Sequence, residues 1–295
     1  MKMAVIGAGK WGQALYHAFS QKNDVVIHSR IPREIENFVS MDEALSREYQ
    51  VMAIPAQFVR SWLEKHFEDR GQKILVAAKG IETATGAFLN DIYGEFVSQQ
   101  RLAYISGPSF AAEVVQSLPT ALMISSVNLE LARTFADALP DYIKGYISDD
   151  IIGAEVSGAY KNVIAIASGV CDGLGLGNNA RAALISRGLV EMTRFGEAFG
   201  AHSETFLSLG GAGDLFLTAS STLSRNYRVG LGLAKGKKMD EILKELGEVA
   251  EGVGTSKALQ KIAEKKGIYL PIASEVYAMI EKGKDPRQSV RDLLG

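Results

Sequence analysis

The order of strand-like and helical patterns along the chain constrains its fold more than any other feature of the sequence. In the first half, short runs rich in Val and Ile alternate with amphipathic segments of helical period. Such alternation predicts a mostly parallel sheet with helices on both faces. From about residue 150 the strand patterns stop and only helical patterns follow. The sequence therefore predicts an α/β protein, with an N-terminal Rossmann-type sheet domain followed by an all-α C-terminal domain.

The expected elements follow from the same patterns. Seven strands are expected in the first half, at residues 2–6, 25–28, 51–54, 73–78, 102–106, 119–125 and 143–147. Helices are expected between several strands, at residues 11–21, 57–68, 84–98 and 128–139, and Ser40 with Glu43 predicts a capping box before a further short helix. Helical patterns in the second half cover residues 151–170, 180–199, 227–235, 239–247, 255–266 and 270–282, and Asp285-Pro286 begins a last helix. We place the domain boundary at the change of pattern, which gives domains of residues 1–148 and 149–295.

The composition is typical of a globular protein that works without a membrane or a nucleic acid. Hydrophobic residues make up 47% and charged residues 22%, and the formal net charge of −2 argues against bulk nucleic-acid binding. No apolar run approaches the roughly 18 residues of a membrane helix, and the N-terminus enters a strand with no room for a signal peptide. The single cysteine, Cys171, cannot form an internal disulfide, and the four histidines show no metal-site spacing. We expect a soluble cytoplasmic protein without a metal.

A glycine motif between the first strand and the first helix predicts a dinucleotide site. In GAGKWG, Gly7, Gly9 and Gly12 permit a tight turn, a close approach of the pyrophosphate and tight packing of helix on strand. The N-terminus of the helix attracts the phosphates. The alternative is a purely structural glycine turn, but the place of the motif in an alternating half favours the dinucleotide.

The end of the second strand bears on the choice of cofactor. NAD sites usually have an acidic residue there for the ribose hydroxyl, whereas this chain has Ser29 and Arg30, with Arg33 shortly after. A guanidinium group suits the 2′-phosphate of NADP. The alternative is a surface arginine in a loop. We expect NADP to be preferred, with NAD still usable.

Lys161 occupies an unusual place in the helix expected at residues 151–170. Its face of the helix carries the small residues Ser157, Gly158, Ala165 and Ser168, and a buried unpaired ammonium costs several kcal/mol. One interpretation is a lysine that extends along an apolar face to water. The other is a functional lysine, with the small residues leaving room for a small substrate over the helix.

Further motifs resemble those of a known family. AAKGIE contains Lys79, SGPSFAAE spans residues 106–113, GGAGD spans 210–214 and SRN spans 224–226. Each alone fits an ordinary loop. Together with GAGKWG, EVSGAYKNVIAIASG and VAEG they resemble, in order, the motifs of bacterial-type NAD(P)-dependent glycerol-3-phosphate dehydrogenases. The resemblance runs from residue 4 to about residue 256, and the stretch between Arg30 and Val51 looks shorter than the family's segment.

The resemblance implies an oxidoreductase that reversibly reduces dihydroxyacetone phosphate to sn-glycerol 3-phosphate with NAD(P)H and so supplies glycerophospholipid synthesis. It implies Lys161 as the general acid and base, with Asp214 as its catalytic partner. The substrate-binding residues that it implies are Lys79, Gly107, Ser109, Lys161, Asp214, Ser224, Arg225 and Asn226. The expected cofactor residues are Gly7, Gly9, Lys10, Trp11, Gly12, Arg30, Lys79, Ala111, Arg225, Val249 and Glu251. A homodimer is the expectation for the family.

The chemistry of these residues agrees with that assignment. Hydride attack on a ketone builds negative charge on oxygen, which an ammonium group both stabilises and protonates. Asp214 can hold Lys161 charged and oriented, and Arg225 with Asn226 suits a phosphate. Two rivals remain: a reductase of β-hydroxyacids, which would need carboxylate recognition, and a regulator that only senses a dinucleotide. Neither explains the combination of Lys161, Asp214 and Arg225.

Overall fold

A computed structural model describes residues 1–294, and by their contacts these form two compact units. The first unit comprises residues 1–78 and 89–154, and the second comprises residues 79–88 and the chain from Glu155 onward. The sequence placed one boundary between residues 148 and 149. The structure instead divides the chain inside the long helix that begins at Ile151, and it assigns residues 79–88 to the second unit.

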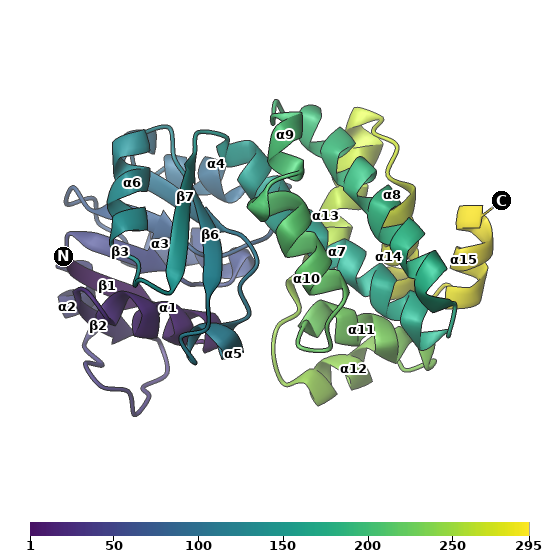
Figure 1. Cartoon of the computed structure of the whole chain (residues 1–295), viewed down its shortest axis with the longest axis horizontal. Helices are drawn as coiled ribbons and strands as arrows, with labels where there is room; N and C mark the ends of the chain where they lie inside the picture. The colour runs from purple at the N-terminus through teal and green to yellow at the C-terminus, as the bar shows by residue number, and fades with distance from the viewer. Residues whose placement is uncertain (295) are drawn as a thin grey trace. The chain divides into compact units, whose positions relative to one another are not determined.

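The described part of the first unit contains one sheet of seven strands (Figure 1), which confirms the predicted mostly parallel sheet. The order across the sheet is β2-β1-β3-β4-β5-β6-β7, and every neighbouring pair is parallel except β5 with β6. The strands are β1 (Lys2–Ile6), β2 (Asp24–His28), β3 (Tyr49–Met52), β4 (Lys73–Val76), β5 (Leu102–Ser106), β6 (Thr120–Ser125) and β7 (Ile143–Ser148).

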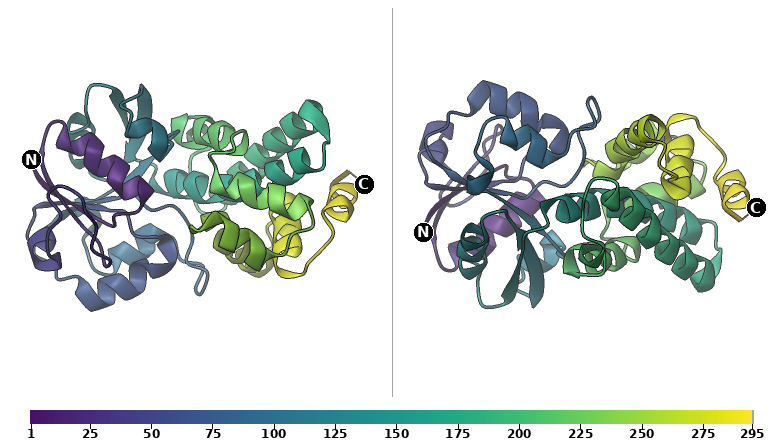
Figure 2. Two further views of the ribbon diagram at one scale, coloured as in Figure 1. Left: turned by 90° about the horizontal axis from the view of Figure 1, so that it is seen from below. Right: turned by 90° about the horizontal axis from the view of Figure 1, so that it is seen from above.

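Helices cover both faces of this sheet (Figure 2). They are α1 (Lys10–Ser20), α2 (Met41–Leu45), α3 (Val59–His66), α4 (Leu89–Gly94), α5 (Ala111–Val114) and α6 (Leu129–Asp137), with short 3₁₀ turns at Ala56–Phe58 and Gln99–Arg101. Leu15 and Phe19 of α1 and Phe135 of α6 belong to one hydrophobic core with the strands. The Ser40 side chain accepts a hydrogen bond from the Glu43 N–H, which confirms that Ser40 caps α2.

The helix expected at residues 84–98 is wrong over much of its length. Only Leu89–Gly94 is α-helical, because residues 79–88 pack with the second unit and Gly86 has a φ of +80°. Residues with a side chain rarely adopt this backbone conformation. A residue with such a φ also interrupts a regular helix.

The second unit is helical, as predicted. Its helices are α7 (Ile151–Gly173), α8 (Gly177–Glu197), α9 (Ser203–Phe206), α10 (Asp214–Ala219), α11 (Arg225–Ala234), α12 (Met239–Leu246), α13 (Glu251–Lys266), α14 (Pro271–Glu281) and α15 (Pro286–Leu294), with a π-helical turn at Leu209–Gly213. Helix α7 is the core of the unit, because its residues from 153 to 171 are all buried. A helix with apolar residues on all its faces, as α7 has, is buried in this way.

Glycines let the backbones of α7 and α11 approach closely. A Cβ atom on Gly230 of α11 would lie 2.0 Å from the Ile166 carbonyl oxygen, and one on Gly169 of α7 would lie 2.0 Å from the Tyr227 carbonyl oxygen. Real Cβ atoms do not approach backbone so closely, so the crossing requires glycine on both helices.

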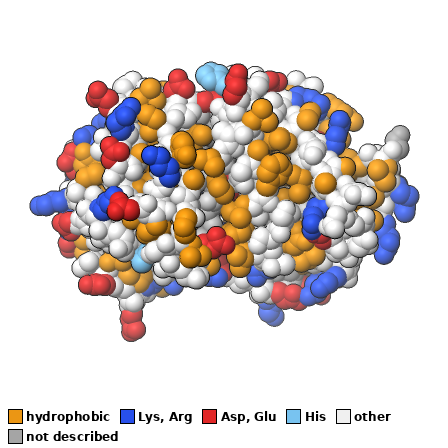
Figure 3. All heavy atoms as spheres, in the orientation of Figure 1, with side chains coloured by type: hydrophobic (Ala, Val, Ile, Leu, Met, Phe, Trp, Pro, Cys, Tyr) orange, Lys and Arg blue, Asp and Glu red, His pale blue; other side chains and the backbone are white. Residues whose placement is uncertain are grey.

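The surface carries charges of both signs. On the face drawn in Figure 3, Lys and Arg side chains are interspersed with Asp and Glu, as a formal net charge of −2 leads one to expect. Within residues 1–294, no helix is both long and apolar enough to cross a membrane. The same residues contain no cluster of three or more His, Cys, Asp or Glu side chains suited to a metal ion.

Candidate active site

The glycine motif at the start of α1 has the geometry of a phosphate cradle. Gly7 has a φ of +111°, and a Cβ on it would lie 2.5 Å from the Ala53 carbonyl oxygen, while a Cβ on Gly12 would lie 1.7 Å from the Gly7 carbonyl oxygen. A Cβ on Gly9, by contrast, would meet nothing within 4 Å. Gly9 is the N-cap of α1, without a side-chain cap and without an acidic residue in the first turn. Open space at an uncapped helix N-terminus fits the pyrophosphate of a dinucleotide.

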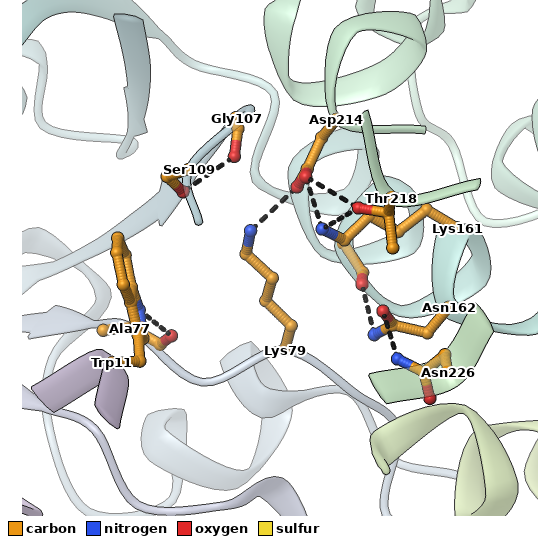
Figure 4. A network of polar contacts seen from close by, with 11 residues as sticks. Trp11, Ala77, Lys79, Gly107, Ser109, Lys161, Asn162, Asp214, Thr218 and Asn226 are labelled. Carbon is orange, nitrogen blue, oxygen red and sulfur yellow. Dashed lines mark hydrogen bonds and ion pairs between the residues drawn. The ribbon is translucent and has the colours of Figure 1, made fainter. Parts of the chain in front are cut away.

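Neighbouring groups of the first unit fix this cradle and a second turn. The Trp11 indole N–H donates to the Ala77 carbonyl oxygen at 3.1 Å, which ties α1 to the end of β4. After β5, Gly107 has a φ of +113°, and the Ser109 hydroxyl donates to the Gly107 carbonyl oxygen at 3.0 Å (Figure 4). Lys10 is an exposed residue at the start of α1, and Ala111 is the first residue of α5.

Arg30 lies in the loop after β2 and is exposed. Among residues 1–294 its guanidinium group has no hydrogen-bond or ion-pair partner, so it remains available to an anion. The hydroxyl of Ser29 donates to the Ile31 carbonyl oxygen at 2.7 Å and shapes the loop.

In the second unit, one buried carboxylate is shared by two lysines (Figure 4). The Lys161 ammonium donates to Asp214 Oδ1 and, at 3.0 Å, to Thr218 Oγ1. The Lys79 ammonium donates to the other carboxylate oxygen of Asp214 at 2.8 Å. The side chain of Asp214 is 2% exposed and that of Lys161 only 8%. Lys161 therefore ends on a buried anion, and its interpretation as a lysine that extends to water is wrong.

The local sequence explains how Asp214 reaches this place. Asp214 is the first residue of α10 and follows the π-helical turn at Leu209–Gly213. A Cβ on Gly211 would lie 2.3 Å from the Phe206 carbonyl oxygen, so the turn needs glycine there. π-helical turns are frequent at functional sites. Thr218 lies one turn further along α10, on the same face as Asp214.

Lys79 joins this group because residues 79–88 pack with the helical unit. The Thr83 hydroxyl donates to the Gly254 carbonyl oxygen and the Lys261 ammonium donates to the Thr83 carbonyl oxygen, both at 3.2 Å. A Cβ on Gly158 of α7 would lie 3.2 Å from Cγ of Lys79. The stem of Lys79 therefore occupies the space that glycine leaves beside α7.

The expectation that small residues of α7 leave room for a substrate is wrong. Ser157, Ala165 and Ser168 are fully buried, and the Ser168 hydroxyl donates to the Ala219 carbonyl oxygen at 2.6 Å. Gly158 faces Lys79. These small residues let neighbouring segments pack closely on α7.

The pKa values of the shared group have opposing causes. Burial lowers the pKa of Lys161 to about 7, with the Asp214 carboxylate opposing this change and the Lys79 ammonium adding to it. Burial by itself would raise the pKa of Asp214, but the two ammonium groups outweigh it and hold that pKa below its ordinary value. One carboxylate cannot fully compensate the buried Lys161 ammonium and the partly exposed Lys79 ammonium, so Lys161 can give up and regain a proton near neutral pH.

A second polar group ties the start of α11 to α7 and α13. The Asn226 amide donates to Asn162 Oδ1 at 2.8 Å, and Asn226 Oδ1 accepts the Gly252 N–H at 2.9 Å. Asn162, next to Lys161, donates to the Gly158 carbonyl oxygen at 3.1 Å. Asn226 is buried, so its first function in this structure is to position α11.

The remaining predicted residues lie at or near the ends of helices in the second unit. Ser224 is the N-cap of α11, and its side chain accepts the Tyr227 N–H at 3.2 Å. Arg225 follows it, with a side chain that is 41% exposed and 3.4 Å from a carboxylate oxygen of Glu248. Val249 is 49% exposed, and Glu251 is the first residue of α13.

Two polar residues of the site were missed from the sequence. Thr218 had a usable signal, because it lies four residues after Asp214 on a helix. Asn162 lies beside Lys161 in the chain, but its bond to Asn226 joins residues that are 64 positions apart and leaves no local trace.

A sheet unit with a dinucleotide-type glycine turn, followed by a helical unit with a buried Lys–Asp–Lys group, defines the class of dinucleotide-dependent oxidoreductases with a helical second domain. The chain matches the N-terminal domain of NAD-dependent glycerol-3-phosphate dehydrogenase over residues 27–132 and the C-terminal domain over residues 150–291. The chain belongs to this family.

Individual relatives match this chain over nearly its full length. The chain is 62% identical to a glycerol-3-phosphate dehydrogenase [NAD(P)+] of Sulfurimonas denitrificans, with 99% of each chain covered. It is 59% identical to the enzyme of the same name from a Nitratiruptor species, with 100% of this chain and 98% of the other covered. The crystal structure of a glycerol-3-phosphate dehydrogenase from Coxiella burnetii superposes with a TM-score of 0.91 at 31% identity, covering 99% of this chain and 98% of that one.

Proposed function

We propose that Lys161 transfers the proton in this enzyme's reaction, and that Asp214 and Lys79 set its pKa. The chain has the activity of its family: it interconverts dihydroxyacetone phosphate and glycerol 3-phosphate with NAD(P) as coenzyme, a reaction of lipid metabolism. The observation that carries the proposal is the buried Asp214 carboxylate shared by two ammonium groups.

The reaction needs a proton at one oxygen atom. NAD(P)H, when bound, would supply the hydride that the carbonyl carbon of the substrate accepts. As negative charge develops on the carbonyl oxygen, the Lys161 ammonium donates its proton there and the Lys79 ammonium stabilises the charge. Asp214 holds both nitrogens in place through its two carboxylate oxygens. In the direction of oxidation, neutral Lys161 accepts the proton of the glycerol hydroxyl.

Arg225 is our candidate for binding the substrate phosphate. Its guanidinium group is partly exposed at the first residue of α11, and its planar fork of N–H donors suits a phosphate. The positive end of α11 adds to this attraction. Ser224 and Asn226 hold the first turn of the helix, and we assign Gly107 and Ser109 to the substrate as well. Binding energy at the phosphate then orients the reacting carbonyl.

We further propose that NADP is preferred over NAD. An exposed, unpaired Arg30 lies after β2, where a dinucleotide-binding unit reads the ribose. The glycine cradle would hold the pyrophosphate, with Lys10, Trp11 and Ala111 as further contacts. Val249 and Glu251 are assigned to the coenzyme with Arg225 and Lys79.

Replacing the proton donor tests this proposal. Lys161→Met keeps an unbranched apolar side chain of similar size but removes the ammonium, so turnover of dihydroxyacetone phosphate should fall about 10²–10⁴-fold. Lys257→Met is the matched control: it removes an ammonium of the same unit that pairs with Glu281 and does not touch Asp214. The parent should oxidise NADPH with dihydroxyacetone phosphate and not with β-keto acids. Near-parental turnover of a folded Lys161→Met enzyme would refute the assignment.

A further inference from the structure

The helical unit has a cavity that the reaction does not use. It has a volume of about 490 Å³, lies among α7, α8, α14 and α15, and none of the candidate site residues is among the described residues that line it. Its wall is mainly apolar and includes Val170, Leu184, Val276, Met279 and Val290. Sites for small organic molecules have about this size and this apolar character.

One polar side chain in the wall lacks a partner. Ser289 of α15 is 2% exposed, lines the cavity, and its hydroxyl has no hydrogen-bond partner within residues 1–294. The buried carboxylate in the wall is satisfied, since Glu191 accepts the Tyr160 hydroxyl and the N–H groups of Ile272 and Ala273. A buried hydroxyl without a partner costs free energy, which a bound molecule can recover.

One guanidinium group beside the cavity has no partner. Arg187 of α8 lines the cavity, is exposed, and has no hydrogen-bond or ion-pair partner among the described residues. Glu275 and Asp292, which also line it, both pair with Lys284 at 2.6 Å. The Arg194 guanidinium donates to the Tyr269 carbonyl oxygen at 2.8 Å. An apolar space with an unpartnered guanidinium group beside it fits a molecule that is apolar and carries a negative charge at one end.

We propose that this cavity is a second binding site, for a small amphipathic anion whose apolar body fills it and whose charged end meets Arg187. The site shares no residue with the catalytic group, so the proposal does not depend on the roles of Lys161 and Asp214. It rests on the apolar wall, on the unpartnered Ser289 hydroxyl and on the free charge of Arg187.

Two fluorescent probes with similar aromatic bodies test this proposal. Anilinonaphthalene sulfonate carries an anion, and N-phenyl-1-naphthylamine does not. Both should bind to the folded enzyme, and Ala183→Trp, which fills the cavity from α8, should weaken both at least tenfold. Ala182→Trp is the matched control, because Ala182 is the neighbouring exposed residue and does not line the cavity. Arg187→Gln should weaken only the sulfonate probe, by roughly two- to fivefold, as expected for an exposed ion pair.

Several results would overturn the proposal. Equal probe binding by the Ala183→Trp and Ala182→Trp variants would show that the probes bind elsewhere. An equal effect of Arg187→Gln on both probes would remove the role of the charge. If the parent binds neither probe and only Ala183→Trp separates a dimer in sedimentation velocity, this face is covered by a second copy of the chain. Thermal unfolding and turnover of each variant check that the enzyme remains folded.

Discussion

Asp214 contacts the ammonium groups of both Lys79 and Lys161. Within the described residues, no other buried carboxylate contacts either group. Such an arrangement is costly for stability, since a buried lysine needs an anion and this anion is shared. Its benefit is chemical. A lysine in water has a pKa near 10.4 and stays almost entirely protonated at neutral pH. Burial and the second ammonium bring the pKa of Lys161 to about 7, where it can serve both directions of the reaction.

The proposed role of Arg225 predicts a loss that depends on the substrate. Arg225→Ala should raise the barrier for dihydroxyacetone phosphate by about 1.5–3 kcal/mol, the value of a hydrogen bond to a charged group. It should affect unphosphorylated dihydroxyacetone much less. Arg228→Ala is the control, because Arg228 is an exposed arginine of the same helix. The quantity to compare is kcat/KM for the two substrates. Equal losses on both would move Arg225 away from the phosphate.

The choice of coenzyme is tested at Arg30. The parent should prefer NADPH, and Arg30→Asp should reverse the preference, because it removes a guanidinium–phosphate pair and places a carboxylate against the 2′-phosphate. Arg33→Asp should shift the ratio less. The measurement is kcat/KM for NADPH and NADH at fixed ionic strength, since exposed charges are screened by salt. An unchanged ratio in Arg30→Asp, or a parent that prefers NADH, would show that Arg30 does not read the ribose.

At the scale of elements, the crossing of α7 and α11 determines where the start of α11 lies. Gly230 and Gly169 bring the two backbones together, and Asn226 joins the same two helices at the end that carries Arg225. The glycines of this crossing are therefore required for packing, which agrees with the burial of the small residues on α7.

Two alanine substitutions on one helix test this packing. In Gly230→Ala the new Cβ would meet the Ile166 carbonyl oxygen at 2.0 Å, so the helices must separate and the free energy of unfolding should fall by about 1–3 kcal/mol. In Gly232→Ala it would meet the Ile242 side chain at 2.7 Å, which can move more easily. The second variant should therefore lose less stability. Denaturant unfolding of both variants measures the difference, and equal losses would contradict this account of the crossing.

The elements also show what the sequence could predict. The seven strands were found because each is a short run rich in apolar residues, and their bounds in the structure agree within two residues. The long helices of the second unit were found by their period. The π-helical turn at Leu209–Gly213 and the short helices α5, α9 and α10 were missed, because four to six residues carry too little periodicity.

Most residues of the site were predicted, but some of the contacts between them were not. Lys161 and Asp214 were expected as partners from the resemblance to a family and from charge. The bond of Lys79 to Asp214 joins residues that are 135 positions apart, and the pairing depends on residues 79–88 leaving the sheet unit. Local patterns in the sequence contain no information on such a contact, and the small residues of α7 were misinterpreted for the same reason.

At the scale of the whole molecule, the two units contain different parts of the proposed site. The first unit contains the glycine cradle, Arg30 and the turn at Gly107 and Ser109. The second contains Lys161, Asp214 and Thr218, and also Lys79 through residues 79–88. The groups that set the pKa of Lys161 therefore all belong to one compact unit, and its proton chemistry is built into that unit.

The central claim is that Lys79 helps to lower the pKa of Lys161, and the pH dependence of kcat/KM tests it most directly. Reduction needs protonated Lys161, so its kcat/KM should fall as the pH rises through about 7, and that of oxidation should rise over the same range. In Lys79→Met the neighbouring ammonium is absent, so the pKa of Lys161 rises. The falling limb of the pH profile for reduction then moves to higher pH.

The test compares the pH of this change in kcat/KM between enzymes. The substrate phosphate has a pKa of about 6 and affects every variant in the same way. Lys257→Met, which removes a charge that does not contact Asp214, should leave the limb where the parent has it. The account predicts a limb near pH 7 in the parent and in Lys257→Met, and a limb at clearly higher pH in Lys79→Met. A limb at the same pH in all three enzymes would contradict it.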